Sequence, residues 1–135
     1  TNQKMTRFIM SISDAASLIL KVTNIAQDGE IFILKMPSVN ILNLGKTIMS
    51  IYKSRNPKSK IAPIKISKIR EKERMDEFLI TPTEIPFCHD MGTMYKISKD
   101  ESKKKISTKD FSSETTKRIS DLKLKKIIND LLDDY

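Results

Sequence analysis

The apolar positions of this chain change between strand-like and helix-like spacing from one segment to the next. Residues 6–12 form a short run rich in β-branched and aromatic side chains, which predicts a strand. Apolar residues then recur at helical spacing and predict an amphipathic helix over 14–25. Ser13 is suited to cap this helix, because its hydroxyl can accept a backbone N–H, and Asp14 favours the first turn.

The rest of the chain continues this alternation. A compact apolar run over 30–36 predicts a second strand, buried on both faces. Asn40 can cap a second helix over 41–53. Further along, the pattern predicts a strand at 61–66, a short helix at 70–79, an extended loop at 80–92, a strand at 94–98, a Lys- and Ser-rich linker at 99–110 and a closing helix at 121–133 capped by Ser120. Alternating strands and helices indicate an α/β fold.

The glycines are too few and too far apart for a nucleotide-binding loop. The chain holds Gly29, Gly45 and Gly92 only. A loop that cradles phosphates needs closely spaced glycines, so that backbone N–H groups can approach the phosphate oxygens. A complete dinucleotide-binding domain is therefore excluded from these 135 residues.

The composition is that of a one-domain globular protein. The 135 residues are 39% hydrophobic, enough for one modest core. A single cysteine excludes a disulfide framework and a cysteine-based zinc site. No apolar run reaches the roughly 20 residues that cross a bilayer, and no signal-peptide pattern is present, so we expect a cytoplasmic protein without a membrane partner. The chain opens on Thr1 and passes directly into a strand-like segment, from which we expect it to be part of a longer protein.

The positive charge is concentrated in one stretch. The net charge is +8, and residues 53–74 alone contain nine basic and two acidic residues. Such a stretch is either a solvated loop and helix surface or an electropositive rim around an anion site. A basic excess of this kind favours an anionic partner, such as a nucleic acid or a phosphate.

Two residue pairs suggest catalysis at first sight. Cys88 and His89 are adjacent on an extended segment, so their side chains point to opposite faces and cannot form a nucleophile–base pair. Tyr95 and Lys99 have the Tyr-x-x-x-Lys spacing of short-chain dehydrogenases, but they fall on a predicted strand that breaks into the charged linker, and not on a helix. We expect no catalytic residue and no metal ligand in this chain.

Arg70 and Glu73 form the most informative pair. Arginine can hold a diphosphate with its bidentate fork, and a glutamate one helical turn later can accept hydrogen bonds from sugar hydroxyls. The alternative is a surface ion-pair network that also includes Arg74 and Glu77. The spacing alone leaves both open.

Several segments together resemble a known family. Residues 5–11 (MTRFIMS) are similar to an M-T-R-F segment of that family, and residues 69–77 align without gaps on its I-R-P-G-E-K-L-H-E motif. Further similarity lies at 14–16, 29–35 and 41–51, and at 113–132, which resembles the C-terminal segment of its capsule-type members. The family that these segments resemble is that of the polysaccharide-biosynthesis UDP-N-acetylglucosamine 4,6-dehydratases of the extended short-chain dehydrogenase/reductase superfamily, some of which are also 5-epimerases.

The resemblance covers only the C-terminal, substrate-binding part of the family. It implies a small α/β subdomain, a small sheet with packed helices, that lacks the Rossmann half. It also implies a sugar-nucleotide-binding subdomain at 1–98, a basic linker at 99–112 and a C-terminal helical extension at 113–135. The NADP site and the catalytic residues of such a lyase would lie in the absent Rossmann half, supplied in cis or in trans. We expect the full enzyme to be a homo-oligomer.

The resemblance also implies roles for three residues. Arg7 and Arg70 would bind the diphosphate of a UDP-N-acetylglucosamine-type substrate from two sides, and Glu73 would accept hydrogen bonds from the ribose hydroxyls. Glu71-Lys72 replaces the Pro-Gly of the family motif, which changes the turn beside Arg70. Alone, the chain would be catalytically inactive and would bind UDP-sugars weakly or not at all.

Two other functions fit the composition. The first is a small basic domain that binds a nucleic acid or an acidic partner, which rests on residues 53–74 and the lysines of the linker. Nucleic acid is the less favoured partner, because the chain has few aromatic residues for base stacking. The second is an assembly role, in which the chain only makes oligomer contacts.

Overall fold

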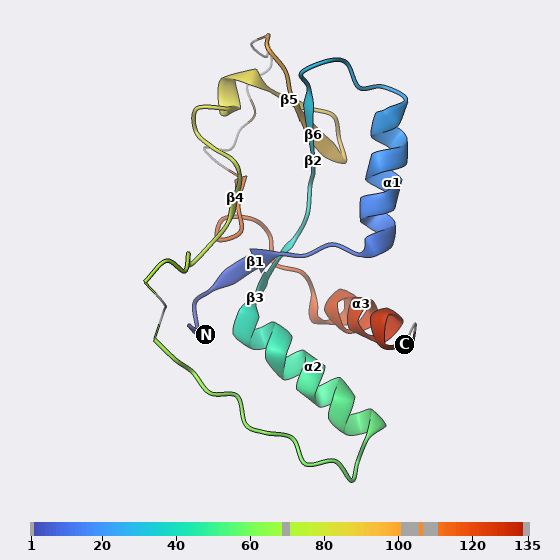
Figure 1. Cartoon of the computed structure of the whole chain (residues 1–135), viewed down its shortest axis with the longest axis vertical. Coiled ribbons are helices and arrows are strands. Elements are labelled where there is room, and N and C mark those ends of the chain that lie inside the picture. The colour runs from blue at the N-terminus through green and yellow to red at the C-terminus, as the bar shows by residue number, and fades with distance from the viewer. Residues whose placement is uncertain (1, 69–70, 101–105, 107–110, 134–135) are drawn as a thin grey trace.

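The chain passes more than once between the two ends of the molecule (Figure 1). The computed structural model describes residues 2–68, 71–100, 106 and 111–133. In chain order the elements are β1 (Thr6–Phe8), α1 (Ile12–Thr23), β2 (Ile31–Leu34), β3 (Ser38–Asn40), α2 (Ile41–Arg55), β4 (Phe78–Ile80), a 3₁₀ turn η1 (Ile85–Phe87), β5 (Cys88–Asp90), β6 (Met94–Ile97), β7 (Phe111–Ser112) and α3 (Asp121–Asp133). Figure 1 shows α1 beside β2 at one end and α2 beside α3 at the other.

The strands of the described residues form three small antiparallel sheets. β1 pairs with β3, β4 pairs with β7, and β2, β6 and β5 form a three-stranded sheet in that order. In the larger sheet Ile31 lies opposite Ile97, and Leu34 lies opposite Met94. The small α/β fold expected from the sequence is confirmed, with its strands divided among several sheets.

Local signals start the three helices. Ser11 caps α1 through a capping box with Asp14, whose backbone N lies 3.0 Å from Ser11 Oγ. The predicted cap at Ser13 was wrong by two residues, so the helix begins earlier and β1 is shorter than predicted. Asn40 caps α2 as predicted, and Ser120 Oγ lies 3.4 Å from the backbone N of Lys123 in α3.

The buried side chains form two clusters. One lies between α2, α3 and β3 and contains Val39, Ile51, Ile119, Leu124, Ile127 and Ile128. The other lies between the three-stranded sheet and the β4–β7 pair and contains Ile33, Ile80, Cys88 and Phe111. By contrast, α1 contributes no buried residue to either cluster.

Three predicted elements were wrong. Residues 61–66 form no strand, because they run beside α2 rather than beside another strand and Pro63 lacks a backbone donor. Residues 71–77 form no helix, since their carbonyl groups bond to β1 instead. The predicted loop at 80–92 contains η1 and β5.

The apolar run at 30–36 is only partly buried, so the predicted burial on both faces was wrong. Ile33 is 9% exposed, whereas Ile31, on the same face of β2, is 54% exposed, and Phe32 and Leu34 on the other face are half-buried. β2 is an edge strand of its sheet, so one of its sides has no neighbouring strand among the described residues. The predicted linker at 99–110 lies almost entirely outside the described residues.

Candidate functional site

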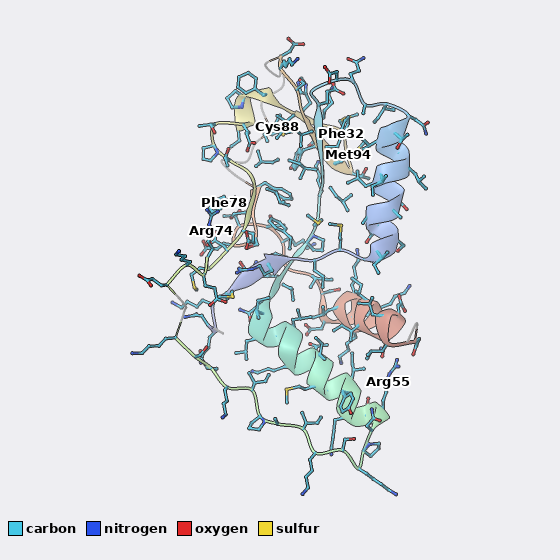
Figure 2. All side chains as sticks on the ribbon, viewed as in Figure 1. Phe32, Arg55, Arg74, Phe78, Cys88 and Met94 are labelled. Carbon is cyan, nitrogen blue, oxygen red and sulfur yellow. The ribbon has the colours of Figure 1, made fainter. Side chains whose placement is uncertain are left out.

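Arg7 joins β1 to residues 71–77. Its Nη1 donates to the carbonyl oxygens of Thr6 at 2.7 Å and Met75 at 3.3 Å. Its Nη2 donates to the carbonyl oxygen of Arg74 at 2.9 Å, and its Nε lies 3.3 Å from Glu77 Oε1. Figure 2 labels Arg74, which lies within this segment, and Phe78, which follows it. The guanidinium therefore holds in place a segment that has no regular secondary structure.

These contacts occupy most of the Arg7 donors. A guanidinium carries five N–H groups, two on each Nη and one on Nε. Three of them reach carbonyl oxygens, and Nε faces the Glu77 carboxylate. One Nη2 hydrogen meets no acceptor in the part of the chain that the structure describes, which leaves it for a ligand. Arg7 can thus offer a single hydrogen bond to a phosphate oxygen without releasing the segment.

The buried Ser113 also holds residues 71–77 in place, and we call Ser113 and Ser38 the serine cluster. The Ser113 hydroxyl donates to the Thr6 carbonyl at 3.1 Å and lies 2.8 Å from Thr6 Oγ1. Ser113 Oγ also accepts from the backbone N of Glu77 at 2.9 Å, and the Ser113 N donates to the Glu77 carbonyl at 2.8 Å. Sequence reasoning missed this cluster, because a buried serine creates no hydrophobic pattern.

Arg118 stabilises the serine cluster by hydrogen bonds. Its Nη1 donates to Ser38 Oγ and to the Ser113 carbonyl, and Ser38 Oγ donates to the Thr116 carbonyl at 3.0 Å. Ser38 and Ser113 are both fully buried. Charged donors to buried oxygens make strong hydrogen bonds, so Arg118 serves as a structural residue.

The structure brings together the segments that carry Arg7 and Glu73. Glu73 is half-buried and comes directly before Arg74 and Met75, whose carbonyl oxygens accept from Arg7. Arg70 lies outside the part of the chain that the structure describes. Glu77 belongs to the surface ion-pair network that was the alternative interpretation of this segment. In the structure Glu77 pairs with Arg7 of β1, which is distant in the sequence.

Cys88, His89 and Tyr95 each contact residues other than the partner that their sequence spacing suggested. Cys88 is fully buried, and burial raises the pKa of its thiol. His89 Nε2 lies 3.0 Å from Ser98 Oγ instead. Tyr95 lies on β6, where the Lys35 ammonium is 4.4 Å from its ring centroid. The described residues contain no group of three or more potential metal ligands.

Two residues of the basic stretch have structural contacts. Lys53 Nζ donates to the carbonyl oxygens of Pro57 at 2.8 Å and Ser59 at 2.9 Å. Arg55 pairs with Asp133 at 2.7 Å and donates to Asn129 Oδ1 at 2.9 Å, which ties α2 to α3. Part of the positive charge at 53–74 therefore stabilises the fold.

Comparison with known proteins identifies the family. Residues 1–99 match the family model described as polysaccharide biosynthesis protein. The chain belongs to this family. It is 38% identical over 138 residues to an uncharacterized membrane protein of Methanocaldococcus jannaschii and 30% identical over 143 residues to a UDP-glucose 4-epimerase of Rickettsia bellii. Each match covers 97% of this chain and 40% of the relative.

A solved structure supports the same assignment. The X-ray structure of Pen from Bacillus thuringiensis matches with a TM-score of 0.75 and 28% identity, over 97% of this chain and 39% of that one. The chain thus spans about 40% of the length of the curated relatives it matches. The small α/β fold corresponds to part of an extended short-chain dehydrogenase/reductase, as expected from the resemblance. No helix among the described residues is long and apolar enough to cross a membrane.

Proposed function

We propose that this chain is the UDP-sugar-binding portion of a nucleotide-sugar enzyme of polysaccharide biosynthesis. The observation that carries the proposal is the attachment of residues 71–77 to β1 by Arg7. This attachment holds Glu73 in a fixed segment beside a guanidinium, which is the donor that diphosphates favour. A fixed segment reduces the entropy lost when a ligand binds.

Three residues share the binding of the nucleotide. Arg70 contacts the diphosphate as the principal donor, and Arg7 adds its remaining Nη2 hydrogen from β1. Glu73 accepts hydrogen bonds from the ribose hydroxyls. The chain supplies affinity and orientation, while NADP and the reacting groups belong to a Rossmann part outside this chain.

The reaction we propose for the whole enzyme is the 4,6-dehydration of UDP-N-acetylglucosamine, with 5-epimerisation in some members. The relative from Rickettsia bellii carries the name UDP-glucose 4-epimerase, and that substrate also contains UDP. The binding roles of Arg7, Arg70 and Glu73 are therefore the same for either reaction. We place the enzyme in the cytoplasm as a homo-oligomer.

Titration of the ¹⁵N-labelled chain with UDP tests this proposal. We expect the amide signals of residues 5–8 and 71–77 to shift, with a dissociation constant weaker than about 1 μM. Arg70→Ala and Glu73→Ala should each weaken UDP binding by about tenfold, because each removes a hydrogen bond to a charged or strongly polar group.

Two matched controls make the titration specific. Lys65→Ala removes one positive charge from the same basic stretch, and Glu71→Ala removes one exposed carboxylate near Glu73. Both should leave UDP binding unchanged. An equal loss in Lys65→Ala and Arg70→Ala would contradict the proposal, since it would indicate non-specific attraction. Undiminished UDP binding in both Arg70→Ala and Glu73→Ala would contradict it as well.

The alternative function is nucleic-acid binding, and a basic groove favours it. Lys46, Lys53, Lys58 and Lys60 line an open groove between α2 and residues 58–64. If this groove binds RNA, affinity for an oligonucleotide will fall steeply with salt and UDP will not compete. We expect no such binding, because Lys53 is committed to two backbone carbonyl groups.

A further inference from the structure

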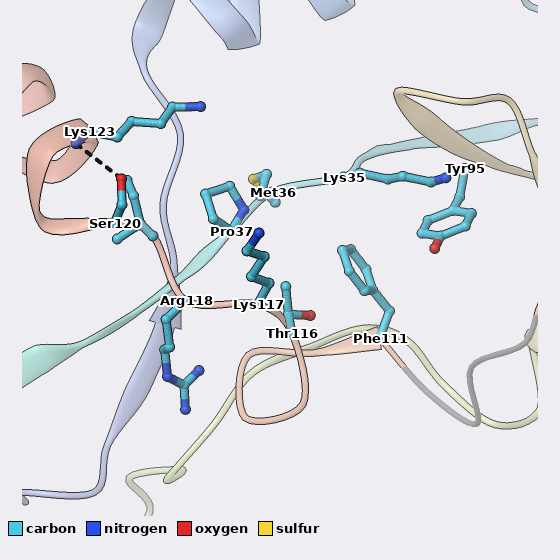
Figure 3. Close-up of a pocket in the computed structure, with 11 residues that line it drawn as sticks. Lys35, Met36, Pro37, Tyr95, Phe111, Thr116, Lys117, Arg118, Ser120 and Lys123 are labelled. Atoms are coloured by element: carbon cyan, nitrogen blue, oxygen red, sulfur yellow. Dashed lines mark hydrogen bonds between the residues drawn. The ribbon is translucent and has the colours of Figure 1, made fainter.

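A pocket lies away from Arg7, between the β2–β3 connection and residues 116–120. Its volume is about 480 Å³, within the range of pockets that enclose small organic ligands. Met36, Pro37 and Ile119 form much of its apolar wall, together with the Phe111 ring. Figure 3 shows the Phe111 ring between Lys117 and Tyr95. Met36, Phe111 and Ile119 are buried, so the wall is part of the folded core.

The charged residues around this pocket are all cationic. Lys35, Lys117, Arg118 and Lys123 line it, and no acidic residue among the described ones does. Figure 3 shows the Lys117 amine directed toward Pro37 and the Arg118 guanidinium directed the opposite way. No ion pair involving the amine of Lys117 or Lys123 is present in the part of the chain that the structure describes.

The other two cations are already occupied. Lys35 pairs with Asp90 at 2.5 Å and lies over the Tyr95 ring. Arg118 donates to Ser38 and to the Ser113 carbonyl. Lys117 and Lys123 are therefore the two positive charges available to a ligand, and they stand beside an apolar and aromatic wall.

We propose that this pocket binds a small organic dianion, such as an aromatic phosphate monoester. The phosphate would pair with Lys117 and Lys123, and the flat apolar body would lie on Pro37 and Phe111. An anion without an apolar body would leave the wall exposed, and a neutral aromatic compound would leave the two charges without a partner. The site is separate from the proposed UDP site, because Arg118 and Ser113 lie between the pocket and residues 71–77.

A titration of the full chain with phenyl phosphate, followed by NMR, tests this site. We expect saturable shifts at Met36, at residues 116–120 and at Lys123. The double variant Lys117→Ala/Lys123→Ala should weaken binding by about tenfold, since two ion pairs are lost. The control Lys125→Ala/Lys126→Ala removes two exposed charges from α3 and should bind as the wild type does.

Two further probes separate the contribution of the two lysines to binding from the contribution of the apolar wall. Inorganic phosphate alone and phenol alone should each bind at least about tenfold more weakly than phenyl phosphate. Equal binding of inorganic phosphate would overturn the proposal, as would an equal loss in the control variant. Shifts confined to residues 5–8 and 71–77 would also overturn it, because the probe would then occupy the other site.

Discussion

Arg7 donates to the carbonyl oxygens of Arg74 and Met75, which lie 67 and 68 residues further along the chain. Its value as an arginine comes from its planar fork, which reaches three carbonyl oxygens while Nε faces Glu77. A lysine has one ammonium group on a flexible stem and cannot make these contacts together. The exchange is therefore a sharp test of the role of Arg7.

Arg7→Lys should lower the free energy of unfolding by about 1–2 kcal/mol, because hydrogen bonds to the segment at 71–77 are lost. Urea denaturation measures this change. Lys65→Ala serves as the control and should stay within about 0.5 kcal/mol of the wild type, since Lys65 is exposed. Equal stability of Arg7→Lys and wild type would show that the segment is held without the guanidinium.

Ser113 carries a larger share of the same attachment. Ser113→Ala removes the acceptor of the Glu77 N–H and the partner of Thr6, and it leaves buried polar groups without hydrogen bonds. We expect a loss of about 1–3 kcal/mol in urea denaturation. Ser50→Ala changes an exposed serine of α2 and should be nearly neutral. A neutral Ser113→Ala would contradict the structural role of the cluster.

Cys88 offers a test at a single sulfur atom. Burial raises the pKa of its thiol, so the thiolate that reacts with alkylating reagents is depleted at pH 8. The chain has one cysteine, which makes the reading unambiguous. Iodoacetamide labelling followed by mass spectrometry should be slow in the folded chain and fast in urea. Rapid labelling of the folded chain would show that the second core cluster opens easily.

Among the elements, the helices differ in how much they contribute to the core. Leu124 of α3 is completely buried, whereas Leu20 of α1 is 70% exposed. Leu124→Ala should cost about 2–5 kcal/mol in the free energy of unfolding, since it leaves a cavity. Leu20→Gln should change stability by less than about 0.5 kcal/mol. Similar losses in thermal or urea unfolding would mean that α1 packs on a surface this structure does not show.

The sequence predicted the elements that depend on local signals. α2 and α3 follow from their apolar spacing and their caps at Asn40 and Ser120. β3 and β7 could not be predicted, because their partners β1 and β4 are distant in the sequence. Residues 71–77 were predicted as helix for the same reason: their competing hydrogen bonds to β1 are invisible in a local window.

The candidate site was likewise predictable from the sequence only in part. The segments that carry Arg7 and Glu73 were found from their resemblance to a family motif, and the structure brings these segments together. Glu77 was visible as a matching residue, yet its pairing with Arg7 required the fold. Ser113 gave no signal, since its importance comes only from its burial.

At the scale of the whole molecule, one surface stands out as apolar. Ile12, Ile19 and Leu20 of α1 are each more than half exposed, and β2 beside them is an edge strand. Exposed apolar surface of this kind is typical of an interface. It fits the proposal that this chain works as one part of a larger nucleotide-sugar enzyme, whose relatives are about two and a half times as long.

We infer that a Rossmann part completes this chain. The most direct measurement is the intact mass, with N-terminal peptides, of the protein isolated from its source cells. We predict a product well above 15.5 kDa that carries a glycine-rich loop and a Tyr-x-x-x-Lys helix before Thr1. A native product of about 15.5 kDa that associates with no Rossmann partner would contradict the claim.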